Sequence, residues 1–117
     1  MKVVINRCYG GFGLSDAAVE RYAELKGIKI VRQKEEHSFG GASWWLDGIE
    51  DDDHYFSSYS ISERSDPVLI QVIEEMGKAA NGWAAELNIV DIPDDVKWEI
   101  EEYDGNEWVA EVHRTWR

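Results

Sequence analysis

The sequence contains one cysteine and two prolines among 117 residues, and only 12 basic residues stand against 24 acidic ones. A single cysteine excludes a disulfide within the chain and is typical of a reducing cytoplasm. No apolar run approaches the roughly 20 residues of a membrane-spanning helix. The net charge of −12 opposes direct nucleic-acid binding, which depends on Lys and Arg side chains that neutralise phosphates. These absences predict a cytoplasmic protein without a membrane segment or a direct nucleic-acid partner.

Hydrophobic residues, in contrast, make up 44% of the chain, which is ordinary for a folded globular protein. We therefore expect a single domain over residues 1–117 with a packed core. Acidic residues gather at positions 51–53 and 91–111. The ordinary interpretation of these charges is solubility. The alternative is a surface that imitates DNA or docks on a basic partner.

Turn and capping signals divide the amino-terminal part into a strand, a helix and a second strand. Residues 2–6 form a short β-branched run that predicts a buried strand. Ser15 is a good cap for a helix that Gly27 ends, and residues 28–34 then predict another strand. Such short joints indicate a β-α-β unit.

The remaining elements predict an α+β fold. Asp66 and Pro67 begin a second helix, and residues 84–92 form a strand. Within the irregular segment 35–62, the best position for a strand is 55–61. With a carboxy-terminal hairpin added, we expect a mixed sheet of about five strands with two helices packed on it.

The register of the hairpin, residues 96–103 and 107–114, has two alternatives. A two-residue turn at Asp104 and Gly105 would set Trp98 opposite Glu111. A three-residue loop ending at Asn106 would instead gather apolar side chains on one face, removing two tryptophans from water at about 1.5–3 kcal/mol each. We expect the three-residue loop. Its inner face carries Trp98, Ile100, Trp108, Ala110 and Val112, and its outer face carries the carboxylates Glu99, Glu101 and Glu111.

Three glycines are crowded just before the first helix, in the run CYGGFGLS at positions 8–15. The spacing matches neither a complete dinucleotide-binding motif nor a P-loop. A strand leading through glycines to a helix start is nevertheless a favourable anion site, and the alternative is a tight turn. An arginine could complete the site, although a salt bridge is its ordinary role. The predicted ligand-binding residues are Tyr9, Gly10, Gly11, Phe12, Gly13, Ser15, Arg32 and Arg64.

Aromatic side chains could add a stacking surface to this site. The candidates are Tyr9, Phe12, Trp44, Trp45, Tyr55 and Tyr59. Six tryptophans in so small a domain must mostly be buried, so the alternative for these rings is the core.

Catalytic and metal-binding interpretations have less support. Cys8 could be a thiolate nucleophile with His37, His54 or His113 as base, but a lone cysteine is more often a small buried hydrophobe. Residues 51–53 with His54 could bind a divalent cation, but adjacent carboxylates are usually a solvated loop. We therefore predict no catalytic residue, no metal and no cofactor.

Motifs at both ends of the chain resemble a protein family of tailed bacteriophages and prophages. They are CYGGFGLS at positions 8–15, the Arg64-x-Asp66-Pro67 element, YDG-x-EWV at 103–109 and HRTW at 113–116. The resemblance covers about the first thirty residues and everything from Arg64 onward. It implies a viral protein of the host cytoplasm and transfers no catalytic residue.

Three functions follow from these observations. The first is a non-enzymatic phage accessory protein that binds, and sequesters, a small anionic, nucleotide-like ligand to counter host defence. The second is an acidic, DNA-mimic-like inhibitor that contacts a host protein through Glu99, Glu101 and Glu111. An enzyme using Cys8 is the third. We rank ligand binding first and catalysis last.

Overall fold

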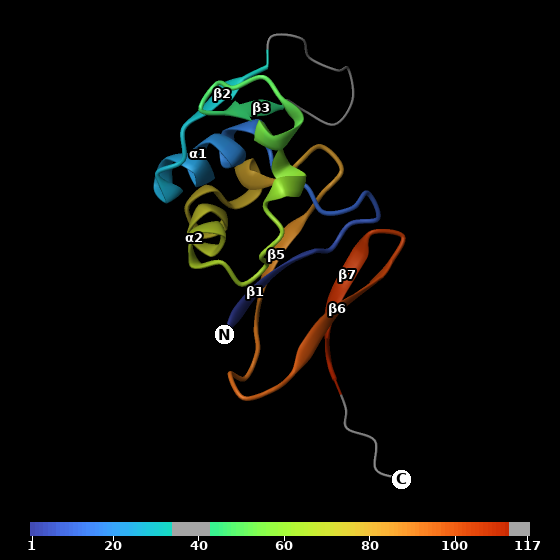
Figure 1. The fold of residues 1–117 in the computed structure, drawn as a ribbon. Coiled ribbons are helices and arrows are strands. Elements are labelled where there is room, and N and C mark those ends of the chain that lie inside the picture. Colours follow the sequence, from blue (N-terminus) through green and yellow to red (C-terminus); the bar gives the residue numbers. More distant parts are fainter. Residues whose placement is uncertain (34–42, 113–117) are drawn as a thin grey trace.

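The computed structural model describes residues 1–33 and 43–112, which form an α+β fold (Figure 1). Its helices and strands are β1 (Lys2–Asn6), α1 (Asp16–Lys26), β2 (Ile30–Arg32), β3 (Trp44–Leu46), β4 (Tyr55–Phe56), α2 (Pro67–Met76), β5 (Leu87–Asp91), β6 (Trp98–Tyr103) and β7 (Asn106–Glu111). Short 3-10 helices occur at η1 (Asp52–His54), η2 (Ser58–Ser60) and η3 (Gly77–Ala80). The predicted fold class is confirmed.

The strands are distributed over three small antiparallel sheets instead of one mixed sheet. β1 pairs with β5, β2–β3–β4 form a second sheet, and β6 pairs with β7. β1 and β2 therefore flank α1 without sharing a sheet. The edge of β1 away from β5 is occupied by other groups: Val4 N–H donates to the Arg64 carbonyl (2.8 Å), and Asn6 N–H donates to the Glu107 carboxylate (2.8 Å).

Helix boundaries follow the expected capping chemistry. The Ser15 hydroxyl accepts from Ala18 N–H, and Gly27 ends α1 with φ 71°. Asp66 caps α2 through Val68 N–H. The two helices pack on each other, and α2 also packs on β1 and β5. In Figure 1 the helices lie on one side of the β1–β5 pair and the hairpin on the other.

The core lies between the helices and the strands that they cover. β1 is almost entirely buried, and the apolar stripe of α2 meets it. The largest fully buried apolar side chains are Val3, Val4, Ile5, Val19, Leu69 and Val72. The strand predicted at 55–61 is shorter than expected, because β4 ends at Phe56 and η2 follows it.

The hairpin register is the two-residue alternative, so our prediction of a three-residue loop is wrong. Tyr103 pairs with Asn106, and Trp98 lies opposite Glu111. Asp104 (φ 49°) and Gly105 (φ 89°) both adopt the left-handed backbone of a type I′ turn, which matches the twist of the strands. The predicted outer face is consequently divided. Glu111 projects on one side of the hairpin, and Glu99 and Glu101 project on the other with Trp108.

Candidate functional site

The glycine loop, residues 10–13, passes between two other backbone segments. A Cβ added to Gly10 would lie 2.0 Å from the Ala84 carbonyl oxygen. Gly11 has φ 97°. A Cβ added to Gly105 in the hairpin turn would lie 2.5 Å from the backbone nitrogen of Gly11. On the other flank, Gly82 N–H donates to the Gly13 carbonyl (2.9 Å). The glycines therefore allow backbone to pack against backbone, as in the tight-turn interpretation.

Asn6 joins the segments beneath the glycine loop. Its side chain is fully buried, and its amide donates to the carbonyls of Cys8 (2.7 Å) and Gly105 (2.8 Å). Its Oδ1 accepts from Glu86 N–H (2.8 Å). One side chain thus ties β1, the loop, the hairpin turn and the start of β5 together. The sequence shows Asn6 only as the polar end of a strand, with no signal for this role.

Arg64 reaches the glycine loop, where its guanidinium lies 3.7 Å from the centre of the Phe12 ring. The same guanidinium binds both oxygens of Glu107, with Nη1–Oε1 at 2.6 Å and Nη2–Oε2 at 3.0 Å. Glu107 is 4% exposed and the Arg64 side chain is 17% exposed, so this is a largely buried bidentate pair. The structure therefore places Arg64 beside the loop, with its charge compensated by a carboxylate.

Two other predicted ligand residues, Arg32 and Tyr9, do not line a cavity beside the glycine loop. Arg32 pairs with Asp16 (3.0 Å) and approaches Glu20 (3.7 Å). Tyr9 is exposed to solvent. Neither residue lines either of the two cavities described next.

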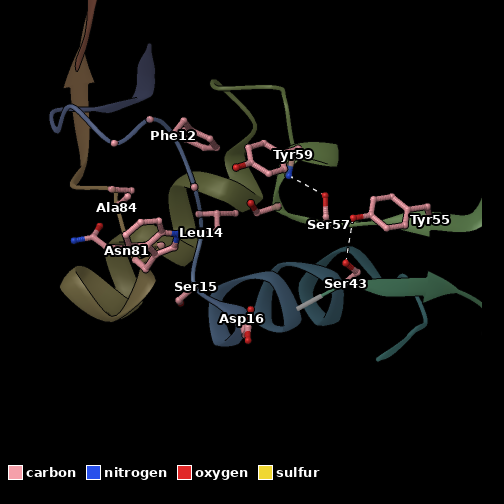
Figure 2. Close-up of a pocket in the computed structure, with 17 residues that line it drawn as sticks. Phe12, Leu14, Ser15, Asp16, Ser43, Tyr55, Ser57, Tyr59, Asn81 and Ala84 are labelled. Atoms are coloured by element: carbon pink, nitrogen blue, oxygen red, sulfur yellow. Dashed lines mark hydrogen bonds between the residues drawn. The ribbon is translucent and has the colours of Figure 1, made fainter. Parts of the chain in front are cut away.

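The larger cavity, which we call the cleft, has a volume of about 730 Å³. Figure 2 shows Phe12 and Tyr59 on one side of it, with Ser15 and Asp16 on the opposite side. Its walls come from four parts of the chain: residues 10–16, residues 81–85, Ser43, and the segment with Tyr55, Ser57, Ser58 and Tyr59. A smaller hollow of about 320 Å³ shares Gly10, Gly11, Phe12 and Tyr59, and extends to Arg64, Glu102 and Glu107.

Two aromatic rings of the cleft face water. Tyr59 is 75% exposed and Trp83 is 83% exposed, which is unusual for side chains of this size. The other aromatic candidates are divided. Trp44 belongs to the core, whereas Trp45 packs edge-on against Tyr55 with centroids 6.1 Å apart. Sequence reasoning missed Trp83, whose signal is its position beside Gly82 in the turn after η3.

Several hydrogen-bond donors of the cleft have no acceptor in the described part of the chain. They are the Trp83 indole N–H, the Tyr59 hydroxyl, the side-chain amide nitrogen (Nδ2) of Asn81 and the backbone N–H groups of Gly10 and Gly13. The serines of the cleft differ, because three of their four hydroxyls already form hydrogen bonds within the protein. Ser15 donates to the Ala79 carbonyl (2.6 Å), Ser43 bonds the Tyr55 hydroxyl (3.1 Å), and Ser57 caps η2. The cleft thus offers donors and rings.

Comparison with known proteins finds no relative of this chain. No protein-family model, curated protein or solved structure matches it. Function is therefore inferred from the chemistry of the cleft, and the resemblance to a phage family stays a prediction.

The catalytic and metal candidates do not converge among the described residues. Cys8 is half-buried, and its backbone N–H and carbonyl both bond the Asn6 side chain. His54 binds Asp51 (2.5 Å), and this hydrogen bond lowers the pKa of the Asp51 carboxyl. His37 and His113 lie outside the described residues. Across 1–33 and 43–112, no three His, Cys, Asp or Glu side chains are grouped to hold a metal, and no helix could span a membrane.

Proposed function

We propose that the protein binds a small planar ligand rich in hydrogen-bond acceptors, of nucleoside or nucleotide type, in the cleft. The exposed rings of Tyr59 and Trp83 carry this proposal, because each keeps a large apolar surface in water beside a cavity of about 730 Å³. Small-molecule sites commonly measure about 300–1,000 Å³. Stacking of a base on an aromatic side chain contributes about 1–3 kcal/mol.

The unused donors of the cleft suit the edge of such a ligand. Carbonyl oxygens and ring nitrogens of a base accept hydrogen bonds from groups like the Trp83 indole N–H and the Asn81 amide. Binding would pair donors that are otherwise satisfied only by water, and would thereby add specificity to the stacking energy.

A phosphate on the ligand would meet mainly neutral donors. The backbone N–H groups of Gly10 and Gly13 are available to it, whereas Arg64 at the end of the smaller hollow is already paired with Glu107. A phosphate that recruited Arg64 would have to compete with a buried bidentate carboxylate. We therefore expect the ring to supply most of the affinity and the phosphate less.

Binding without chemistry amounts to sequestration of the ligand. The resemblance to phage proteins supports an accessory role in the host cytoplasm, in which the protein withdraws a nucleotide-like signal from host defence.

Calorimetry with nucleosides, mononucleotides and dinucleotides tests the proposal. We expect at least one of these compounds to bind, and Tyr59→Ala and Trp83→Ala each to weaken it about tenfold, the equivalent of about 1.4 kcal/mol. Tyr9→Ala is the matched control, because Tyr9 is an exposed ring outside the cleft. Failure of every compound to bind, or an equal loss in the Tyr9 variant, contradicts the proposal.

A further inference from the structure

We infer that the outer edge of β6 is a docking site for an extended, basic segment of a partner protein, which would add to the hairpin as a third strand. This inference concerns a surface distinct from the cleft and is independent of the ligand. It rests on the backbone of the edge, on the charges beside it and on the aromatic side chains of the hairpin face.

The register shows which backbone groups of β6 are unused. Val112 N–H donates to the Lys97 carbonyl (2.8 Å), and alternate residues from Lys97 onward direct their backbone groups toward β7. Trp98, Ile100 and Glu102 direct theirs the other way. Over the described residues, these outward N–H and carbonyl groups have no protein partner. β7 lies beside β1, so β6 is the open edge.

Charge selects the kind of segment that this edge accepts. Glu99, Glu101 and Glu102 are exposed along the strand and present carboxylates on both faces of the hairpin. Opposite charges on paired strands are stabilising, and like charges directly opposite each other are destabilising. A second copy pairing antiparallel about Ile100 would set Glu99 against Glu101 of that copy. The edge therefore disfavours self-association and favours lysine or arginine side chains.

Aromatic side chains provide anchors on the face that carries Glu99 and Glu101. Tyr103 is exposed, and Trp108 is 40% exposed with its indole N–H bonded to Glu101 (3.1 Å). Tyrosine and tryptophan are enriched among the residues that dominate interface energies. Glu107 also ties the hairpin to Asn6 and Arg64. Little ordering of the hairpin itself therefore opposes strand addition.

A main-chain test uses a short peptide of alternating lysine and valine residues as the probe, measured by calorimetry. Glu102→Pro removes an outward N–H that the hairpin does not use, and Glu102→Ala removes the same charge but keeps that donor. We expect the proline variant to bind the peptide about tenfold more weakly than the alanine variant, which corresponds to about 1.4 kcal/mol of binding free energy. Equal affinities of the two variants, or no binding to the unmodified protein, overturn the inference.

A charge test does not depend on the proline variant folding. Glu99→Lys with Glu101→Lys is compared with Glu50→Lys and Asp53→Lys, two exposed acids of the segment between β3 and β4, outside the hairpin, that give the same change in net charge. We expect only the hairpin pair to abolish peptide binding. An equal loss in both pairs means non-specific attraction to an acidic protein and overturns the inference.

Two further readouts separate this inference from its alternatives. Trp83→Ala is expected to leave peptide binding unchanged, so failure of the cleft and failure of the edge are distinguishable. Sedimentation of the unmodified protein is expected to show no dimer that Glu102→Pro disrupts. Such a dimer would overturn the inference in favour of self-association through β6.

Discussion

The glycine loop has two sides that differ in how their polar groups are used. On the inner side, Asn6, Arg64 and Glu107 form a buried network in which the backbone, amide, guanidinium and carboxylate groups bond one another. On the outer side, the rings of Tyr59 and Trp83 are exposed to solvent, and several hydrogen-bond donors that line the cleft have no acceptor among the described residues. The inner side therefore stabilises the fold, and the outer side is free to bind.

Glu107→Ala is the substitution with the largest expected effect on this contrast. It removes the acceptor of both Arg64 and the Asn6 N–H, and leaves the largely buried Arg64 guanidinium with only the Val4 carbonyl (3.3 Å) and the Phe12 ring among its described contacts. Breaking a buried ion pair from one side costs about 3–5 kcal/mol. We expect the free energy of unfolding, measured by urea denaturation, to fall by that amount.

Glu101→Ala provides the matched control on the same hairpin. Its carboxylate is exposed and bonds only the Trp108 indole among the described residues, so we expect a loss below about 1 kcal/mol. Similar losses for the two variants would show that the Arg64–Glu107 pair has no special role in stability.

The second comparison is between two glycines of the same loop. Gly10→Ala would place Cβ 2.0 Å from the Ala84 carbonyl oxygen, which is backbone and cannot move aside cheaply. We expect a loss of about 3 kcal/mol, at the upper end for overpacking. Gly13→Ala meets no atom within 4 Å, so its effect on thermal unfolding should stay within about 1 kcal/mol. A Gly10 variant as stable as the Gly13 variant would contradict the close packing of the inner side.

Local chemistry made the helices predictable, whereas the hairpin register depended on a distant contact. Ser15, Gly27 and the Asp66-Pro67 pair signal helix ends through their own side chains and backbone, so the sequence reveals them. The two-residue turn was also visible at Asp104 and Gly105. Apolar burial favours the three-residue loop, because it gathers Trp98 and Trp108 on one face. The observed register instead buries Glu107, whose carboxylate is paired with Arg64.

The position of the candidate site was easier to predict from the sequence than the residues that form it. The glycine motif identified the loop, and the structure brings Arg64 to it. The sequence could not show that Arg64 is compensated, because 43 residues separate it from Glu107. Tyr59 is a stacking candidate in the sequence, but Trp83 lines the same cleft only because Gly82 packs on Gly13.

Acid pH provides the third and smallest test, through a second buried carboxylate of the interior. Asp66 accepts hydrogen bonds from the Tyr22 hydroxyl (2.6 Å) and Val68 N–H (2.8 Å), and pairs with Lys26 (2.9 Å). Burial raises the pKa of Asp66, but these contacts outweigh it and hold the pKa below its ordinary value of 3.8. The unfolded chain therefore binds more protons in this range, so the stabilisation is present above about pH 4 and is lost as pH falls through the folded-state pKa.

Asp66→Asn separates this contribution from the other carboxylates. The amide keeps an acceptor for Val68 N–H but loses the ion pair with Lys26, so we expect a loss of about 1–2 kcal/mol near neutral pH. The difference from the unmodified protein should shrink as the pH falls below about 4, because protonation removes the same interaction. Trp83→Ala, on the outer side, should leave the free energy of unfolding unchanged both near neutral pH and below about pH 4. A constant difference for Asp66→Asn across the titration would mean that its charge contributes nothing to the interior.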